Sequence, residues 1–117
     1  MFFGLGDKSH DLNLRGHAFE NWNTDAFGYS PQTDPLYRSV PFYYALDQGL
    51  AYGIFLDNTY RTRFSFDRQD NQISSFSANG GEMNYYFIYG PELTEVTKQY
   101  AELTGKPELP PLWSLGF

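Results

Sequence analysis

The chain has 117 residues, enough for one small domain or for part of a larger one. It carries 14 acidic and 8 basic residues, a formal net charge of −6, and the basic residues are scattered along the sequence. Nucleic-acid backbones and anionic membranes attract clustered Lys and Arg, so we expect neither as a partner. Cysteine is absent, which excludes disulfides and thiolate metal sites.

The first forty residues combine one short strand with a long polar segment. Residues 2–6 are expected to form the strand. Residues 7–41 are punctuated by Gly and Pro and follow neither helical nor strand periodicity. A loop of this length is usually functional or disordered. Because leaving its embedded aromatic side chains in water would be costly, the sequence predicts an ordered, functional loop.

The middle of the chain is typical of antiparallel β-structure. Five short runs bounded by turn residues are expected as strands: residues 41–46, 51–57, 60–67, 73–78 and 84–89. Phe64 and Phe66 alternate with polar side chains, so both are expected to face a core. Glycines at 49 and at 80–81 predict hairpins between successive runs. Such a series is the local unit of a β-sandwich.

One helix is expected near the C-terminus. Apolar side chains recur there at 3-4-3 spacing and define a single face: Leu93, Val96, Tyr100 and Leu103. Gly105 and the proline at 107 predict its end. Residues 106–111 (KPELPP) are expected as an extended linker. Residues 113–117 resume an apolar, strand-like pattern, which has no partner strand in this sequence.

The loop contains a Trp22-Asn23-Thr24-Asp25 cluster that suits a sugar ligand. Sugars present apolar C–H faces and a rim of hydroxyls, and a carboxylate can accept two hydrogen bonds from vicinal hydroxyls. Asp25 is therefore a candidate binding residue. The alternative is a turn or cap in which these side chains bond to local backbone groups. Trp22 is either a stacking platform beneath a sugar ring or an anchor for the loop.

Other polar motifs in the loop do not define a chemical site. His17 and Glu20 form H-x-x-E, and His10-Asp11 follows Asp7 by three residues. A metal site needs three or four converging ligands with supporting contacts, so we expect structural hydrogen bonds here and no metal or cofactor. A retaining glycosidase needs two carboxyl groups about 5 Å apart. The sequence singles out no such pair, and no catalytic residue is assigned.

Several segments, in this order and spacing, resemble glycoside hydrolase family 31, the α-glucosidase/α-xylosidase family. They are GLGDK (4–8), NLRGH (13–17), WNTD (22–25), TDPLY (33–37), SVPF (39–42), YGIFLDNTYR (52–61), YYFIYGP (85–91), LTG (103–105) and PPLWSLGF (110–117). The resemblance implies a partial galactose-mutarotase-like supersandwich, mainly β and antiparallel, with one short C-terminal helix. Residues 1–105 would be part of the N-terminal β-sandwich domain, including an active-site loop at 7–41. Residues 106–117 would be a linker and the first strand of an absent (β/α)8 catalytic barrel.

The resemblance also implies a role for the loop. In the family, its aspartate binds sugar hydroxyls on the leaving-group side of the cleaved bond. By that resemblance Asp25 contacts substrate, with Thr24 and Trp22 as weaker candidates. The ligand would be an α-glucosidic oligosaccharide.

The sequence departs from the family in lacking the Trp-x-Asp-Met-type motif of the nucleophile. We therefore expect a fragment of a retaining α-glucosidase that is inactive alone. An α-xylosidase of the same family, a non-catalytic carbohydrate-binding module and a purely structural sandwich piece are the alternatives. The earlier sandwich strands are also missing, and exposed sheet edges would invite self-association.

Overall fold

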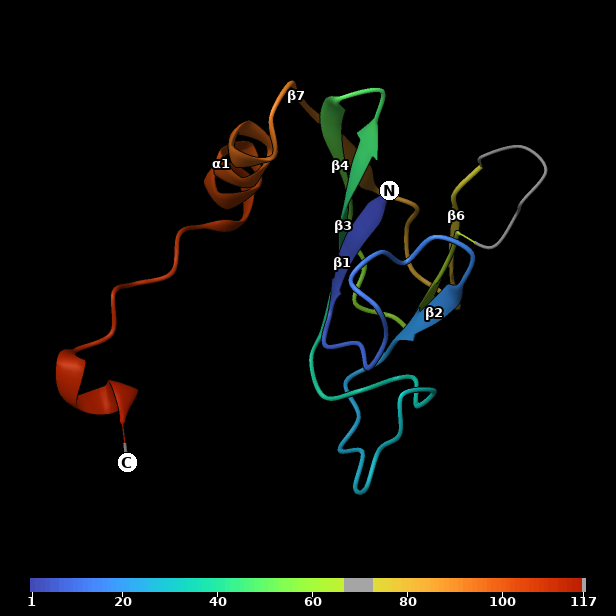
Figure 1. The fold of residues 1–117 in the computed structure, drawn as a ribbon, viewed down its shortest axis with the longest axis vertical. Helices are drawn as coiled ribbons and strands as arrows, with labels where there is room; N and C mark the ends of the chain where they lie inside the picture. The colour runs from blue at the N-terminus through green and yellow to red at the C-terminus, as the bar shows by residue number, and fades with distance from the viewer. Residues whose placement is uncertain (67–72, 117) are drawn as a thin grey trace.

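A computed structural model describes residues 1–66 and 73–116 (Figure 1). The chain forms two antiparallel sheets, one of four strands in the order β1-β3-β4-β7 and one of three in the order β2-β5-β6. The elements, in chain order, are β1 (Phe2–Gly6), β2 (Ala18–Asn21), β3 (Ser39–Asp47), β4 (Leu50–Leu56), β5 (Thr62–Ser65), β6 (Ser75–Ala78), β7 (Tyr85–Gly90), α1 (Leu93–Thr104) and the 3-10 helix η1 (Leu112–Leu115). The predicted mainly-β, antiparallel architecture with one α-helix is confirmed.

The two sheets share an aromatic core. In Figure 1, β2 and β6 lie on one side of the four-stranded sheet and α1 lies on the other. Tyr43 and Phe64 are 2% and 0% exposed, and their rings meet edge to face at 6.0 Å. Phe66 packs against both Tyr43 and Phe2. Phe64 and Phe66 thus face inward, as the alternation predicts, and each such burial contributes roughly 1.5–3 kcal/mol.

The helix packs closely on the outer face of the four-stranded sheet. Val96 is fully buried against that face, and Tyr100 stacks on Phe42 at 4.1 Å. The predicted four-residue apolar face is only partly used, because Leu93 and Leu103 remain 38% and 45% exposed. The helix ends at Gly105, as expected. Neither helix in the described part of the chain is long and apolar enough to cross a membrane.

One of the two predicted hairpins is confirmed and the other is wrong. Strands β3 and β4 are joined by Gln48 and Gly49, both with positive φ, as a tight hairpin requires. Strand β7 instead pairs with β4, while β6 pairs with β5 in the other sheet. The connection between β6 and β7 crosses from sheet to sheet. Asn58 Nδ2 holds this crossing by donating to the carbonyls of Gly80 (2.9 Å) and Glu82 (3.1 Å).

Two further segments differ from expectation. Strand β2 lies inside the stretch predicted to be loop and pairs with β5, so that Phe19 faces Phe64. Four residues are too few for a periodic signal in the sequence. Residues 113–115 of the strand expected near the C-terminus lie in η1, and residue 117 lies outside the described residues. The division at residue 105 stays a prediction.

Candidate functional site

The WNTD cluster opens a long loop between β2 and β3. This loop, residues 22–38, projects beyond the ends of both strands (Figure 1). Its two arms are joined by backbone and side-chain bonds: Thr24 N donates to the Leu36 carbonyl (3.3 Å), and the Tyr37 hydroxyl donates to the Ala26 carbonyl (2.7 Å). Leu36 is buried, 4% exposed. The loop is therefore ordered by hydrogen bonds between its own arms and by the burial of Leu36.

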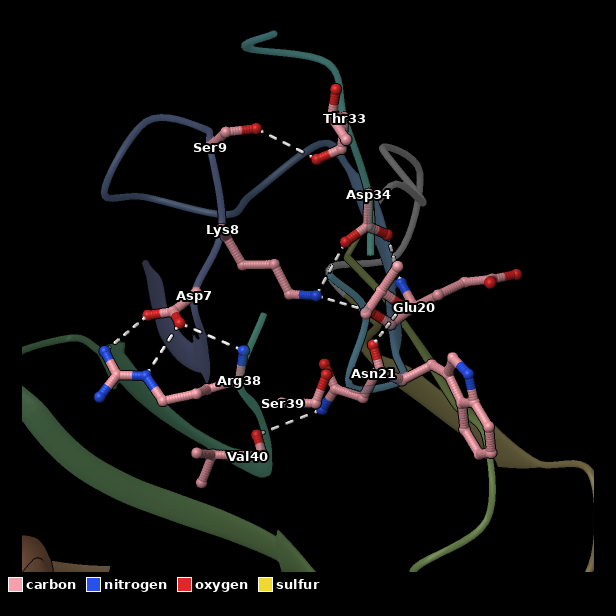
Figure 2. Close-up of polar contacts among 12 residues, drawn as sticks. Asp7, Lys8, Ser9, Glu20, Asn21, Thr33, Asp34, Arg38, Ser39 and Val40 are labelled. Carbon is pink, nitrogen blue, oxygen red and sulfur yellow. Dashed lines mark hydrogen bonds and ion pairs between the residues drawn. The ribbon is translucent and has the colours of Figure 1, made fainter. Parts of the chain in front are cut away.

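The base of the loop is tied to β3 by two asparagines. Asn23 Oδ1 accepts a hydrogen bond from the Ser39 backbone N–H at 2.8 Å. Asn21 Nδ2 donates to the Val40 carbonyl at 3.2 Å, a contact that joins the two sheets (Figure 2). Both side chains satisfy backbone groups of β3 that are distant in sequence, so they tie the loop base to the neighbouring sheet rather than forming a local turn or cap.

A nearly buried ion pair fixes the returning arm of the loop. Figure 2 shows Lys8 reaching between Glu20 and Asp34. Lys8 Nζ donates to the Glu20 carbonyl (2.6 Å) and to Asp34 Oδ1 (2.8 Å), and its side chain is only 4% exposed. Asp34 Oδ2 also accepts the Glu20 backbone N–H at 2.5 Å. Asp34 thereby clamps the loop to both β2 and the segment after β1.

A second, exposed ion pair lies at the end of the same arm. Arg38 Nε and Nη2 donate to the two carboxylate oxygens of Asp7 at 2.9 and 3.0 Å, a two-point contact (Figure 2). The hydrogen bonds from Arg38 hold the pKa of the Asp7 carboxyl below its usual value, against a smaller opposing effect of desolvation. The Lys8–Asp34 and Asp7–Arg38 ion pairs therefore hold the arm of the loop that leads into β3 at two positions.

The three predicted binding residues occupy different environments. Asp25 is exposed, and among the described residues its carboxylate has no hydrogen bond and no ion pair. The Thr24 hydroxyl donates to the Trp22 carbonyl at 2.9 Å. Trp22 is 49% exposed, so it is not a fully buried anchor. Thr24 thus bonds to a local backbone group, as the turn-or-cap alternative expects, whereas Asn23 bonds to the distant Ser39 and the Asp25 carboxylate has no partner among the described residues.

Trp22 also lines a cavity that no sequence motif indicated. The cavity measures about 520 Å³ and lies between the ends of the two sheets. Its lining includes Asn21, Trp22, Ser39, Asp57, Tyr60 and Thr62; of the predicted binding residues only Trp22 belongs to it. Asn21 and Thr62 are register partners on β2 and β5 and are 4% and 2% exposed. Thr62 alternates with Phe64 in the predicted strand and could have been assigned an inward position, whereas Asn21 lies in a segment that the sequence predicts as loop.

The histidine and acidic motifs of the loop serve structural contacts. The rings of His10 and His17 lie 3.9 Å apart, and both contact Phe19. Glu20 pairs with Arg61, 2.6 Å from oxygen to nitrogen. Across residues 1–66 and 73–116, no group of three or more Asp, Glu or His side chains is placed to hold a metal ion.

Comparison with known proteins agrees with this architecture. The family model of the glycosyl hydrolase 31 N-terminal galactose mutarotase-like domain matches residues 1–65. Alpha-glucosidase 2 of Bacillus thermoamyloliquefaciens is 44% identical over 117 residues, which are 99% of this chain and 15% of that enzyme. The alpha-xylosidase XylQ of Lactiplantibacillus pentosus is 35% identical over 97% of this chain and 14% of its own length.

A solved structure shows the same fold. The GH31 dextranase of Flavobacterium johnsoniae, in complex with isomaltotriose, superposes with a TM-score of 0.86 at 48% identity, covering 99% of this chain and 14% of that one. The chain therefore spans about one seventh of the length of these relatives. It belongs to glycoside hydrolase family 31, and its residues 1–65 match the family's N-terminal galactose mutarotase-like domain.

Proposed function

We propose that the loop of residues 22–38 supplies Asp25 to the substrate site of a family 31 α-glucosidase. The observation that carries the proposal is the contrast within the loop. Its base and both arms are fixed by hydrogen bonds and two ion pairs, yet the Asp25 carboxylate is exposed and has no partner among the described residues. A fixed loop presenting a free charged acceptor loses little conformational entropy when it binds a ligand.

The neighbouring residues support the same role more weakly. The Thr24 hydroxyl donates a hydrogen bond to the Trp22 carbonyl, so the Thr24 hydroxyl oxygen can still accept a hydrogen bond from a sugar hydroxyl. The half-exposed Trp22 ring offers an apolar surface for the C–H face of a sugar. The two contacts would orient a ring whose hydroxyls bind Asp25.

A glucosyl substrate is supported by two of the relatives named above, although a further α-glucosidase, from Saccharolobus solfataricus, is 32% identical to this chain. The α-glucosidase and the dextranase are 44% and 48% identical to this chain, and the α-xylosidase is 35% identical. We infer hydrolysis of terminal α-linked glucose from oligosaccharides as the activity of the full-length enzyme. The 117-residue chain alone is expected to be inactive, because the Trp-x-Asp-Met-type motif of the family's nucleophile does not occur in it.

The decisive variant is Asp25→Asn in the full-length enzyme. It keeps the size of the side chain and removes the charge. We expect kcat/KM for maltose and isomaltose to fall about 10- to 100-fold, the kinetic equivalent of one hydrogen bond to a charged group. Asp11→Asn, at another exposed acid before β2, is the matched control and should leave kcat/KM unchanged. Equal kinetics of Asp25→Asn and wild type would overturn the proposal.

Titration of the isolated chain separates this proposal from a carbohydrate-binding module. A module would bind maltose by itself and lose binding in Asp25→Ala. If the loop binds substrate only together with the catalytic barrel, millimolar maltose should not bind at the Asp25 loop of the isolated chain. Activity should then be found only in the full-length enzyme.

A further inference from the structure

The connection between β6 and β7 begins with an asparagine whose side chain makes no hydrogen bond. Six of the seven asparagines of the sequence lie among the described residues. The carboxamides of five are hydrogen-bonded to protein groups: Asn13, Asn21, Asn23, Asn58 and Asn84. The sixth, Asn79, is exposed, and its carboxamide has no partner within the described part of the chain. The Asn79 side chain is therefore free to rotate in contact with water.

The residue after Asn79 leaves the backbone nitrogen open to this side chain. Asn79-Gly80 is the only Asn-Gly step in the sequence. Gly80 has no Cβ that could shield its own N–H from the Asn79 carboxamide. Across residues 1–66 and 73–116, the Gly80 N–H donates to no protein group. The carbonyl carbon of the Asn79 side chain and the nitrogen of Gly80 are thus both unengaged.

The backbone on either side of this step is held through other atoms. The Asn79 N–H donates to the Arg61 carbonyl at 3.0 Å, and the Gly80 carbonyl accepts from Asn58 Nδ2 at 2.9 Å. The Tyr60 ring packs on Gly80 so closely that a Cβ there would lie 2.8 Å from a ring atom. These contacts leave the two unengaged groups out, but they fix the length of backbone between the Arg61 and Asn58 contacts.

We propose that Asn79-Gly80 is a site of spontaneous deamidation and that its isoaspartate product loosens the connection between the sheets. The Gly80 nitrogen loses its proton to solvent and attacks Cγ of Asn79, and the side-chain nitrogen leaves as ammonia. A five-membered succinimide ring results. Water then adds to one of the two ring carbonyls and opens the ring. One opening gives an ordinary aspartate, and the other gives isoaspartate, in which the backbone runs through the former side chain. Solvent water is the only co-reactant.

Isoaspartate changes the connection in a way that aspartate does not. Both products add one negative charge to a chain of net charge −6. Only isoaspartate inserts a methylene group between the Asn79 nitrogen and the Gly80 carbonyl, so the bonds of these two groups to Arg61 and Asn58 cannot both keep their lengths. Asn58 Nδ2 also donates to the Glu82 carbonyl at 3.1 Å. The lengthened backbone therefore weakens the contacts that hold the crossing from one sheet to the other. Neither Asp25 nor its loop takes part.

The test is incubation of the 117-residue chain at mildly alkaline pH and body temperature, followed by proteolytic digestion and mass spectrometry of the peptides. Chromatography separates the aspartate and isoaspartate forms. Asn79 should convert first, at a rate within about threefold of its rate in the urea-unfolded chain, because the fold engages neither reacting group. Asn84, exposed but bonded through Nδ2 to Asp57 at 3.3 Å, should convert at least about tenfold more slowly.

Two variants separate the chemistry from its structural effect. Asn79→Gln keeps the amide but requires a less favourable six-membered ring, so it should not convert over the same period. Asn79→Asp introduces the charge without the extra methylene and should have the Tm of fresh wild type. Wild type converted to isoaspartate should lose about 4 °C in Tm, the effect of losing one ordinary hydrogen bond in a domain of this size.

Three results would overturn the proposal. The first is protection of Asn79 by more than about tenfold in the folded chain relative to the unfolded one, which would show that the fold prevents ring closure. The second is the conversion of another described asparagine before Asn79. The third is an unchanged Tm of the isoaspartate form. If circular dichroism shows that the isolated chain does not fold, the same peptides are measured in the full-length enzyme. An Asn79 that converts only after unfolding of that enzyme contradicts the proposal.

Discussion

Lys8 and Asp34 form the ion pair that fixes the site loop, with 2.8 Å between Nζ and Oδ1. The two partners are unequally buried, since the side chain of Lys8 is 4% exposed and that of Asp34 is 21% exposed. Lys8 depends on Asp34 to balance its charge, whereas Asp34 reaches water and also accepts the Glu20 N–H. Loss of the carboxylate should therefore cost more than loss of the ammonium group.

Asp34→Asn should lower the free energy of unfolding by about 3 kcal/mol, because it strands a buried ammonium group. Lys8→Met keeps the apolar stem and should cost only about 1 kcal/mol, the worth of an ordinary hydrogen bond. Urea unfolding of the two variants and wild type measures the difference. Equal losses in the two variants would show that the burial of Lys8 does not decide the stability of the pair.

The contribution of the exposed Asp7–Arg38 pair to folding stability should depend on pH. Because Arg38 lowers the pKa of Asp7 in the folded chain, the carboxylate stabilises the fold above its ordinary value of 3.8. That contribution is lost as the pH falls through the lower, folded-state pKa. Asp7→Asn should therefore have a lower Tm than wild type at pH 7, and the gap should close below pH 3.8. A gap that is independent of pH would contradict this assignment.

The contact between α1 and the sheet depends on the missing side chain of Gly53. A Cβ there would lie 2.7 Å from the Phe42 ring and 2.8 Å from a Val96 methyl group. Gly53→Ala should therefore destabilise the chain by about 1–3 kcal/mol through overpacking. Gly116→Ala is the control, since a Cβ at that position meets nothing within 4 Å. Thermal unfolding followed by circular dichroism distinguishes the two, and similar Tm values for both variants would contradict the packing argument.

Strand β7 is the exposed edge through which the isolated chain is expected to self-associate. It is the last strand of its sheet, and alternate side chains on one face, Tyr85, Phe87 and Tyr89, are 53%, 61% and 55% exposed. A lysine on an edge strand opposes edge-to-edge pairing. Sedimentation velocity should show dimers or larger species for wild type and mainly monomer for Phe87→Lys. Leu12→Lys, at an exposed loop position, should behave as wild type; a monomeric wild-type chain would contradict the expectation.

Local patterns in the sequence predicted the elements whose stability is local. Gly49 supplies a positive φ in the turn between β3 and β4, and Gly105 ends the helix, so both positions could be predicted from residue type, unlike the positive φ of Gln48. The Gly80-Gly81 signal was equally clear but misleading. It marks a turn without saying which strand β7 pairs with afterwards, and that choice depends on β4, which is distant in sequence.

Of the candidate site, Asp25 could be predicted from the sequence, whereas the cavity could not. Asp25 was singled out by a resemblance to a family, and its exposure agrees with the proposed role without testing it. The cavity lining belongs to no motif. Asn21 and Thr62 meet because β2 pairs with β5, and a four-residue strand within a long loop gives the sequence too little periodicity to predict that pairing.

The central claim, that this chain supplies Asp25 to a sugar substrate, is tested most directly by a crystal structure of the full-length enzyme with a non-hydrolysable α-glucoside. We predict a carboxylate oxygen of Asp25 within about 2.5–3.2 Å of a sugar hydroxyl. An Asp25 side chain that is paired with a protein cation, or that points away from the bound sugar, would contradict the claim.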